Sequence, residues 1–459
     1  MNGGVKLNIK SIYENIEIVK IVNEIDGYIT NFTNDTRKIK NDGCYLGIKG
    51  ENNDGNLFYM EAFKNGAKVV ILDHYEENKS DLKYLEENNK SIIVVQDTTK
   101  ALGDLARYKR SIFKKDVIAI TGSAGKTSTK DIVYSVLKEK YKAYKTCGNK
   151  NNHIGLPLTI LSMDENTEIL VLEMGMNHFG EISYLTSIAR PNVAIITNIG
   201  TAHIGNLGSR ENILKAKLEI LEGIDKNGYL IINNDNNLLH EWYLANKDKF
   251  NIITIGINNN SDYLATDISV SDNSSTFKVL NKEYFVPVSG EHFIYNALMG
   301  IAVGNLYHEE YESIYEGIKT FELSSNRMNI ISRESNITII DDSYNANYDS
   351  MSYAIKYLGA LSGRRIAVLG SMFELGDYTE ELHRKIGKLV VDEGIDILVT
   401  VGKEANYIYE EAKEKIKAIH FDSNSDAIKF LKSIIKEGDY ILIKASNSMK
   451  FSEIALALR

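Results

Sequence analysis

The stretch that decides the fold of this chain is Val117-Ile118-Ala119-Ile120-Thr121-Gly122-Ser123-Ala124-Gly125-Lys126-Thr127. An apolar, β-branched run breaks there into a glycine turn, and a helical pattern follows from about residue 128 to residue 141. Glycines let backbone N–H groups approach an anion, and the N-terminus of a helix adds partial positive charge. Lys126 supplies a point charge, and the Thr127 hydroxyl can ligate Mg²⁺. The order of strand, turn, Gly-Lys-Thr and helix therefore predicts a phosphate loop that binds a nucleotide.

The spacing of this loop is unusual. A standard phosphate loop has its first glycine five positions before Gly125, where this chain has Ile120, so the loop is the shorter form TGxxGKT. We expect the phosphates to be surrounded by Gly122, Ser123, Ala124, Gly125, Lys126, Thr127 and Ser128.

Length and charge restrict the class of protein. The chain has 459 residues, which is too long for one hydrophobic core and suggests about three domains. It is 43% hydrophobic and 25% charged, as ordinary globular proteins are. The formal net charge of −9 argues against bulk nucleic-acid binding, although a small anionic ligand needs only a local basic pocket.

The sequence favours a cytoplasmic location. Residues 1–6 lack the basic and apolar regions of a signal peptide, and no apolar run approaches the length needed to cross a bilayer. Cys44 and Cys147 are too few for a disulfide framework and match no metal-binding spacing. We expect two reduced thiols in a cytoplasmic protein without membrane insertion.

Three segments differ in their pattern of strands and helices. Residues 1–112 mix short apolar strands with helical stretches such as 98–112. Residues 113–322 alternate buried-looking strands with helices, which predicts a mostly parallel sheet, extended by an antiparallel part around 261–288. After residue 323 the alternation restarts and predicts a second, separate doubly wound sheet. The predicted class is α/β, with domains at 1–112, 113–322 and 323–459.

Two candidate metal ligands come directly after central strands. Glu173 ends the run Val171-Leu172-Glu173, and His203 follows an apolar strand at 193–198. The carboxyl ends of parallel strands share one edge, so both side chains should lie on the same rim as Lys126 and Thr127. There they can hold metal ions that neutralise a transferring phosphoryl group. Each residue alone is equally well explained by a structural hydrogen bond.

Three further features also have a structural and a functional explanation. Lys215 and Lys217 lie on a predicted helix, where their spacing favours a solvated face. Arg327 could reach across a cleft to a phosphate. Residues 341–347 end a strand in side chains suited to ribose contacts, but Asp, Asn and Ser are also common turn residues.

Together these motifs resemble those of the Mur ligases of peptidoglycan synthesis. Within that family the chain is most similar to the ligases that join D-alanyl-D-alanine to a UDP-N-acetylmuramoyl-tripeptide. The resemblance runs nearly end to end. It is carried by TGxxGKT and by residues 35–38, 50–55, 149–157, 173–175, 290–292 with Asn296, 342–347 and 369–376.

The resemblance implies ATP-dependent amide formation with Mg²⁺. ATP would phosphorylate the terminal carboxylate of a UDP-muramoyl-peptide, and the amino group of a dipeptide would then displace the phosphate. Phosphorylation gives a poor electrophile a good leaving group, so the enzyme has to supply positioning and charge neutralisation. It also implies that the first domain binds the uridine nucleotide, the second binds ATP and the third, Rossmann-like, lies on the acceptor side. The expected assembly is a monomer.

The family's functional residues carry over to matching positions of this chain. The resemblance implies catalytic roles for Lys126, Glu173, His203 and Lys217; the metal ligands would be Thr127, Glu173, His203 and a Lys217 carbamylated by CO₂. Asn296 would contact adenine, Asp342 the ribose and Arg327 the phosphates. The donor would be bound by Asp35, Thr36, Arg37, Lys49, Gly50, Asp54, Asn151 and Asn152, and the acceptor by Asn345, Asn347, Ser371 and Asn447. Because Arg327 and Asp342 belong to the third segment, a complete ATP site requires the second and third domains to meet.

Four positions depart from the family pattern. The family has aspartate at the position of Ser371, proline at Tyr348, histidine at Asn56, and Lys-Gly-Ser-Arg where this chain has Lys444-Ala445-Ser446-Asn447. Three of the departures lie in the third segment, and the loss of an arginine removes a possible bidentate contact with a carboxylate. They leave the identity of the acceptor open.

Two alternatives to the standard ligase therefore remain. One is a diverged relative that activates a similar carboxylate but joins a different amine. The other is a nucleotide-binding partner protein without catalysis, against which the complete set of Lys126, Thr127, Glu173, His203 and Lys217 argues.

Overall fold

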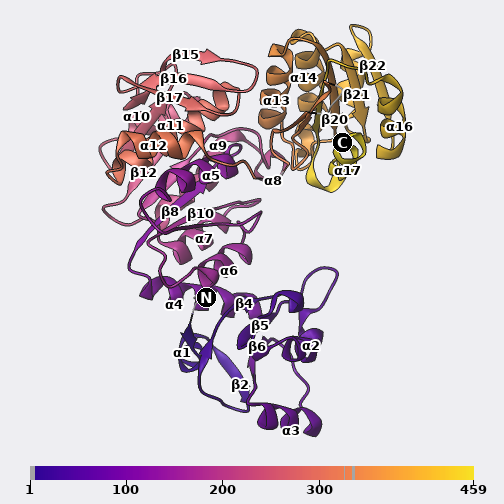
Figure 1. Cartoon of the computed structure of the whole chain (residues 1–459). Helices are drawn as coiled ribbons and strands as arrows, with labels where there is room; N and C mark the ends of the chain where they lie inside the picture. Colours follow the sequence, from indigo (N-terminus) through magenta and orange to yellow (C-terminus); the bar gives the residue numbers. More distant parts are fainter. Residues whose placement is uncertain (1–5, 325, 333–335) are drawn as a thin grey trace.

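The N-terminal domain is a small mixed sheet covered by helices. The computed structural model describes residues 6–324, 326–332 and 336–459, and this domain forms its lower part in Figure 1. The five-stranded sheet has the order β2-β7-β6-β5-β4, in which only the β2–β7 pair is antiparallel. Its elements are β2 (Ile18–Val22), β4 (Phe32–Thr33), β5 (Gly43–Gly47), β6 (Ala67–Leu72), β7 (Ser91–Val95), α1 (Ile9–Asn15), α2 (Tyr59–Lys64) and α3 (Lys79–Asn88). A separate pair joins β1 (Leu7–Asn8) to β3 (Tyr28–Ile29).

The helix α4 (Thr98–Ile112) connects this domain to the next one and has the bounds expected from the sequence. Asp97 caps its N-terminus by accepting hydrogen bonds from the backbone of Thr99 and Lys100. The helix packs against α6 (Gly155–Ser162) and α7 (Glu181–Ala189) of the central domain.

The central domain contains a seven-stranded parallel sheet, as the alternation of strands and helices predicts. Its order is β14-β13-β12-β11-β8-β10-β9, so the strand that precedes the phosphate loop, β8 (Asp116–Thr121), lies between β11 (Val193–Ile196) and β10 (Ile169–Glu173). The other strands are β9 (Ala143–Lys145), β12 (Tyr229–Asn233), β13 (Asn251–Gly256) and β14 (Tyr263–Leu264). Val117, Ile118, Ala119 and Ile120 are fully buried, which explains why β8 is a continuous apolar run.

The prediction for residues 261–288 is wrong in one respect. Only the two-residue β14 joins the large sheet, and it does so in parallel. The strands β15 (Thr266–Val270), β16 (Ser275–Val279) and β17 (Lys282–Val286) form a separate antiparallel sheet of three strands. The three strands form their ladder hydrogen bonds with one another, in antiparallel hairpins. The small sheet therefore forms without pairing to an edge strand of the parallel sheet. The domain ends with α11 (Glu291–Leu306) and α12 (Tyr311–Lys319).

The C-terminal domain has a sheet of its own, which confirms the second doubly wound unit. The order is β18-β19-β23-β20-β21-β22, and the unpredicted edge strand β18 (Asn329–Ser332) is antiparallel to its neighbour. The other elements are β19 (Thr338–Asp341), β20 (Arg364–Gly370), β21 (Ile397–Val401), β22 (Lys417–Phe421), β23 (Asp439–Lys444), α13 (Tyr348–Ala360), α14 (Thr379–Asp392), α15 (Asn406–Ala412), α16 (Asn424–Ile434) and α17 (Ser452–Leu458).

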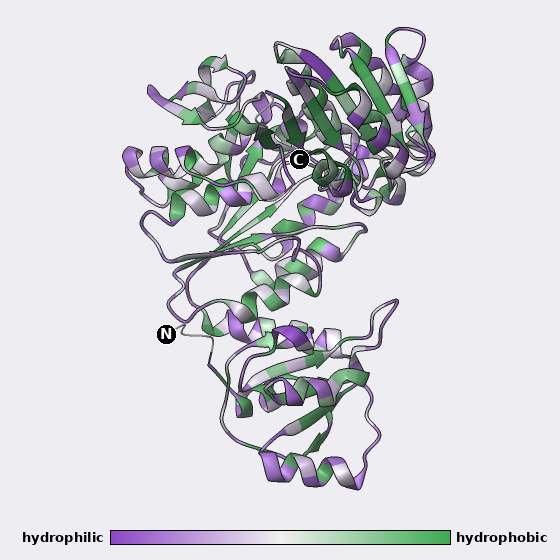
Figure 2. Cartoon of the chain, turned by 45° about the vertical axis from the view of Figure 1, so that its right-hand side comes forward, coloured by the Kyte–Doolittle hydropathy of each residue, from purple (hydrophilic) through white to green (hydrophobic). Residues whose placement is uncertain are grey.

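Apolar residues concentrate on the strands inside each domain, while the outer helix faces are mixed or polar (Figure 2). Within the described ranges, no helix is both long enough and apolar enough to span a membrane.

Candidate active site between the central and C-terminal domains

The phosphate loop is held open by two glycines in the left-handed region. Gly122 has φ +149° and Gly125 has φ +80°, and a Cβ on Gly122 would lie 1.8 Å from Thr197 Oγ1. Asn198, at the end of the neighbouring strand, accepts hydrogen bonds from the backbone N–H groups of Ser123 (3.1 Å) and Ala124 (2.9 Å). Helix α5 (Lys126–Leu137) then begins, and Gly125 in the capping position brings no side chain to cover its first N–H groups. The loop is therefore preformed for an anion.

Lys126 folds back over its own loop. Its Nζ donates to the Gly122 carbonyl at 2.8 Å. Burial lowers the pKa of this amine, the positive charge of Arg327 lowers it further, and Glu173 opposes the shift. An anionic ligand beside the amine would favour its charged form.

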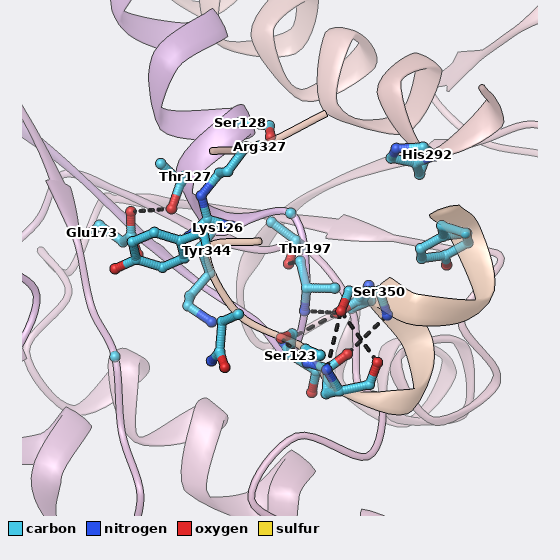
Figure 3. A pocket seen from close by; sticks show the side chains of 18 of the residues that line it. Ser123, Lys126, Thr127, Ser128, Glu173, Thr197, His292, Arg327, Tyr344 and Ser350 are labelled. Carbon is cyan, nitrogen blue, oxygen red and sulfur yellow. Dashed lines mark hydrogen bonds between the residues drawn. The ribbon is translucent and has the colours of Figure 1, made fainter. Parts of the chain in front are cut away.

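Glu173 and Thr127 form a buried pair beside the loop. Thr127 Oγ1 donates to Glu173 Oε2 at 2.9 Å (Figure 3). Asn151 Nδ2 donates to Glu173 Oε1 at 2.8 Å. A group of three His, Cys, Asp or Glu side chains able to hold a metal does not occur in the part of the chain that the structure describes. One hydroxyl and one carboxylate nevertheless fit Mg²⁺, which commonly takes its remaining ligands from water and substrate phosphates.

The two lysines of helix α9 (Arg210–Leu218) have different environments. Lys215 is exposed, in agreement with the helical spacing, but Lys217 is only 1% exposed, so the solvated face predicted from spacing is wrong for this residue. Burial lowers the pKa of Lys217 well below its usual value, and the charge of Lys126 lowers it further. The side chain is thus a buried amine that loses its proton more readily than an ordinary lysine does.

His203 lies at the rim of the cavity, but its side chain contacts Glu374 and not Glu173. It precedes the short helix α8 (Ile204–Leu207), has φ +63°, and places Nδ1 2.5 Å from Glu374 Oε2 of the C-terminal domain. The hydrogen bond to His203 lowers the pKa of Glu374. The histidine therefore joins the two domains at the edge of the cavity.

The far end of the cavity offers an amide and two stacked rings. Asn296 Oδ1 accepts from Thr129 Oγ1 at 3.1 Å, while its buried Nδ2 has no hydrogen-bond partner among the described residues. The rings of His292 and Tyr353 stack across the domain boundary with centroids 5.0 Å apart. Burial lowers the pKa of His292 to about 4, so this ring is neutral at physiological pH. An unsatisfied donor beside aromatic rings suits a heterocyclic base.

The C-terminal domain contributes charged groups from the opposite side. The Arg327 guanidinium lies 4.2 Å from the centroid of the Tyr344 ring, and both side chains face the phosphate loop (Figure 3). Asp342 forms an ion pair with Lys444 and accepts from the Met328 backbone at 3.1 Å. Asn347 Nδ2 donates to the Ser123 carbonyl at 3.2 Å.

These groups enclose one cavity of about 380 Å³. Most residues expected from the sequence at the ATP and metal sites line it: Ser123, Ala124, Gly125, Lys126, Thr127, Ser128, Glu173, His203, Asn296, Arg327 and Asp342. So do Asn151, Asn152, Asn345 and Asn347 from the donor and acceptor sets. Gly122 and Lys217, which the sequence also places at these sites, are not among the residues that line the cavity. The required meeting of the second and third domains is present in this structure.

The remaining donor residues gather in the N-terminal domain. Asp35 caps a short turn by accepting from the Arg37 backbone, and the Arg37 side chain lowers the pKa of Asp35 to about 2. Thr36 Oγ1 donates to Glu61 at 2.7 Å. Lys49 and Asp54 form an isolated β-bridge around Gly50. None of these residues lines the described cavity, and their role as a donor site stays a prediction.

Two of the four departures from the family pattern have structural explanations. Asn56 is buried and donates to both Asp54 and Asp73 at 2.8 Å. Tyr348 is the first residue of α13, a position where proline is favoured, and the capping box of Asn347 and Ser350 starts the helix without it.

The last two departures, Ser371 and Asn447, lie outside the lining of the cavity. Ser371 is fully buried, and its Oγ accepts from the Ala405 backbone at 3.2 Å. Asn447 Nδ2 donates to the Tyr344 carbonyl at 2.8 Å, so it fixes the loop that carries Tyr344. Direct contact of Ser371 and Asn447 with an acceptor stays a prediction.

Several lining or supporting residues were missed by sequence reasoning. Asn198, Tyr344 and Lys444 could have been found from their positions just after, or at the end of, predicted strands. Lys130, with Nζ 3.9 Å from Glu173 Oε2, lies one helical turn after Lys126 and follows from that spacing. The stack of His292 on Tyr353 has no sequence signal, because the two rings belong to different domains.

Comparison with known proteins covers nearly the whole chain. Sequence models of three domains match it: the Mur ligase catalytic domain at residues 28–110, the Mur ligase middle domain at 120–304, and the Mur ligase glutamate ligase domain at 326–447. The UDP-N-acetylmuramoyl-tripeptide–D-alanyl-D-alanine ligase of Bacillus subtilis is 39% identical over 427 residues, which cover 92% of this chain and 91% of that protein.

Two solved structures are similar over the full architecture. One is the UDP-N-acetylmuramoylalanyl-D-glutamyl-2,6-diaminopimelate–D-alanyl-D-alanyl ligase of Acinetobacter baumannii, with a TM-score of 0.85 and 28% identity over 99% of both chains. The other is the MurF ligase of Thermotoga maritima in complex with ADP, with a TM-score of 0.81 and 28% identity over 93% of this chain and 96% of that one.

Proposed function

The chain belongs to the Mur ligase family, and on that premise we propose that it joins D-alanyl-D-alanine to a UDP-N-acetylmuramoyl-tripeptide in peptidoglycan synthesis, converting ATP to ADP and phosphate. The observation that carries the proposal is the single cavity that the phosphate loop shares with Arg327 and Asp342 of the C-terminal domain. A cavity closed from both sides suits phosphoryl transfer, because it positions the reactants and excludes water.

The phosphates of ATP are bound by the central domain and covered by the C-terminal one. The first turn of α5 and Lys126 hold the β- and γ-phosphates, and Arg327 neutralises charge from the other side. Asn296 receives the adenine through its unsatisfied Nδ2, and Asp342 the ribose.

Thr127 and Glu173 are the residues that would hold Mg²⁺, and His203 lies further along the same rim. When bound, the metal neutralises charge on the transferring phosphoryl group. Asn151 fixes one oxygen of Glu173 and thereby orients the other toward Thr127.

Lys217 is carbamylated in this proposal. Its neutral amine attacks CO₂, an N–C bond forms and one proton is released, which converts a buried cation site into an anion. Its lowered pKa supports the reaction, because only the unprotonated amine is a nucleophile. The negative charge would also compensate the positive charge of Lys126 nearby.

The donor is anchored by its uridine diphosphate on the N-terminal domain, at Asp35, Thr36, Arg37, Lys49, Gly50 and Asp54. Its peptide runs past Asn151 and Asn152, so that the terminal carboxylate reaches the γ-phosphate. The carboxylate oxygen attacks phosphorus, ADP leaves, and the dipeptide amine then displaces phosphate from the acyl phosphate. The acceptor lies on the side of Asn345, Asn347, Ser371 and Asn447. The enzyme acts as a monomer in the cytoplasm.

The test is ADP release by the purified chain with ATP, Mg²⁺, UDP-N-acetylmuramoyl-tripeptide and D-alanyl-D-alanine, with mass spectrometry of the product. We expect turnover only when all components are present, and a product larger than the donor by one dipeptide residue unit. Turnover with the same donor and another amine, but none with D-alanyl-D-alanine, would instead assign a diverged ligase.

A further inference from the structure

On the side of His203, the central domain meets a loop of the C-terminal domain. This rim loop, residues 371–376, follows β20 and leads through the short turn η4 (Gly376–Tyr378) into α14. Helix α8, which begins just after His203, packs against η4. In Figure 1, α8 lies on the side of the central domain that faces the C-terminal domain. The rim loop is therefore part of the contact that closes the ATP cavity.

The rim loop is attached to the central domain through side-chain and backbone atoms. The Glu374 carboxylate contacts His203, and the Glu374 carbonyl accepts from the Gly205 backbone at 3.0 Å. The two backbones approach so closely that a Cβ on Gly205 would lie 2.4 Å from the Gly376 nitrogen. Docking of the two domains at this place therefore depends on the detailed shape of the rim loop.

The rim loop adopts a conformation that must be held by its surroundings. Glu374 has φ +64°, in the left-handed region, which a residue with a side chain adopts only at a cost in free energy. Just before it, the Phe373 backbone N–H donates to Ser446 Oγ at 3.0 Å. The Met372 backbone N–H donates to His383 Nε2, also at 3.0 Å. Two hydrogen bonds from within the C-terminal domain thus hold the residues that precede Glu374.

The hydrogen bonds of His383 define its protonation state. Its Nδ1 lies 2.7 Å from the Thr379 carbonyl oxygen, which can only accept, so the proton is on Nδ1. Nε2 then carries a lone pair, as its contact with the Met372 N–H requires. The ring is fully buried, and burial lowers its pKa, although the Thr379 carbonyl and Glu404 oppose the shift. The ring is therefore a neutral, buried acceptor for the rim loop.

We propose that His383 is a positioning residue, which holds Met372 through its Nε2 lone pair and thereby keeps Glu374 in the position that docks the C-terminal domain on residues 203–208. The inference rests on the proposed function, because the docked domains together make up its ATP site. His383 is not among the residues that line the cavity, so it acts through the rim loop and not on ATP. A rim loop released from His383 would lose the strained conformation of Glu374, and His203 would lose its partner across the domain boundary.

The experiment measures ADP affinity by calorimetry, at a temperature where circular dichroism shows each variant to be folded. His383→Leu leaves the buried Met372 N–H without its acceptor, so we expect the Kd for ADP to rise about tenfold. His383→Gln carries a carbonyl oxygen that can reach the position of Nε2, and should return the Kd to within about threefold of the wild-type value. The values of kcat/KM for ATP should follow the same order.

The matched control is His420→Leu. His420 is another hydrogen-bonded histidine of the same domain, and its Nδ1 contacts the Thr400 hydroxyl at 2.9 Å. It lies on the edge strand β22, so the variant should leave ADP affinity unchanged. Glu374→Ala should weaken ADP binding by a factor similar to that of His383→Leu. The double variant should add little to either change, because both remove the same docking contact.

Unchanged ADP affinity in folded His383→Leu, or equal losses in His383→Leu and His383→Gln, would overturn the inference and leave His383 a role in stability alone. A second measurement is ¹⁵N NMR of the wild-type histidines, with the His383 signal identified by its absence in His383→Gln. We expect its proton on Nδ1, and a proton on Nε2 would also overturn the inference, whether or not His383→Leu folds.

Failure of the proposed function is a different result, because ADP binding needs no peptide substrate. A chain that shows this pattern of ADP affinities but does not join D-alanyl-D-alanine to the tripeptide would support the role of His383 and contradict the proposed acceptor.

Discussion

Asp349 at the start of α13 accepts two hydrogen bonds from Thr201 of the central domain, one from the backbone N at 2.7 Å and one from Oγ1 at 2.9 Å. The approach is so close that a Cβ on Gly200 would lie 2.2 Å from Asp349 Oδ2. This contact fixes the N-terminus of α13, and therefore Asn347, against the phosphate loop. The cavity at the phosphate loop depends on this contact, because the C-terminal domain contributes Arg327 and Asp342 to its lining.

Asp349→Ala should weaken the closed arrangement of the two domains. Hydrogen bonds to a charged group contribute about 1.5–3 kcal/mol, so we expect kcat/KM for ATP to fall roughly 10- to 100-fold. Small-angle scattering should show a larger radius of gyration for the variant. Asp422→Ala, at a fully exposed carboxylate of the same domain, is the control. Unchanged kinetics and scattering for Asp349→Ala would show that the contact does not govern closure.

Lys126→Ala should remove phosphoryl transfer while leaving the fold intact. The amine is the fixed positive charge of the loop, and loss of such a group costs about 10²–10³-fold in kcat. Its pKa is already lowered by burial, so its removal should not destabilise the domain. Lys138→Ala, at an exposed residue just after the same helix, should remain active. Cellular function retained in Lys126→Ala would favour a non-catalytic role.

Glu173→Gln should raise the Mg²⁺ concentration needed for activity. A neutral amide is a poorer ligand for a hard cation than a carboxylate is, and we expect a shift of about tenfold or more in the half-saturating concentration. A titration with MgCl₂ at fixed ATP measures it. Asp131→Asn alters a buried carboxylate of α5, the helix that follows the phosphate loop. Asp131 pairs with Lys145, so this variant should affect stability rather than the Mg²⁺ requirement. An identical Mg²⁺ curve for Glu173→Gln would contradict the assignment.

Carbamylation of Lys217 should make activity depend on CO₂ and pH. The lowered pKa means that the neutral, reactive amine is present at a lower pH than for an ordinary lysine, and activity should fall as pH falls through that pKa. Between the lowered value and the usual 10.5, the unfolded chain binds more protons, so the stability of the unmodified chain should rise with pH.

The measurement for Lys217 is ¹³C NMR in ¹³C-bicarbonate, together with activity after removal of CO₂. We expect a carbamate signal that is absent in Lys217→Ala and retained in Lys215→Ala, whose side chain is exposed. Full activity without CO₂ and no carbamate signal would refute the modification.

Gly122→Ala should both destabilise the central domain and abolish nucleotide binding. The added Cβ would overlap Thr197 Oγ1, and φ +149° is unfavourable for alanine, so the free energy of unfolding should fall by more than 1 kcal/mol. Gly438→Ala is the control for backbone strain alone, since its φ is +83° and no atom lies within 4 Å of its Cβ. Similar thermal melts for the two variants would mean that the close contact with Thr197 is unimportant.

Local patterns were sufficient for elements whose stability is local or whose burial is complete. The sequence predicts the helix at Thr98–Ile112 to the residue, and Asp97 caps this helix in the structure. It predicts β8 to within one residue, because a strand buried on both faces is apolar throughout. The sheet around residues 266–286 was misplaced, because alternation identifies a half-buried strand but not the sheet that it joins.

The sequence by itself determined the phosphate loop, the two parallel sheets and the positions of Lys126, Thr127 and Glu173, because strand ends and helix starts are encoded by neighbouring residues. Only the tertiary structure decided that Lys217 is buried, that His203 meets Glu374, and that Asp349 fastens one domain to the other. Those relationships join residues far apart in the chain. They depend on which surfaces pack together. Burial lowers the pKa of an amine or aligns a carboxylate, and burial arises only from that packing.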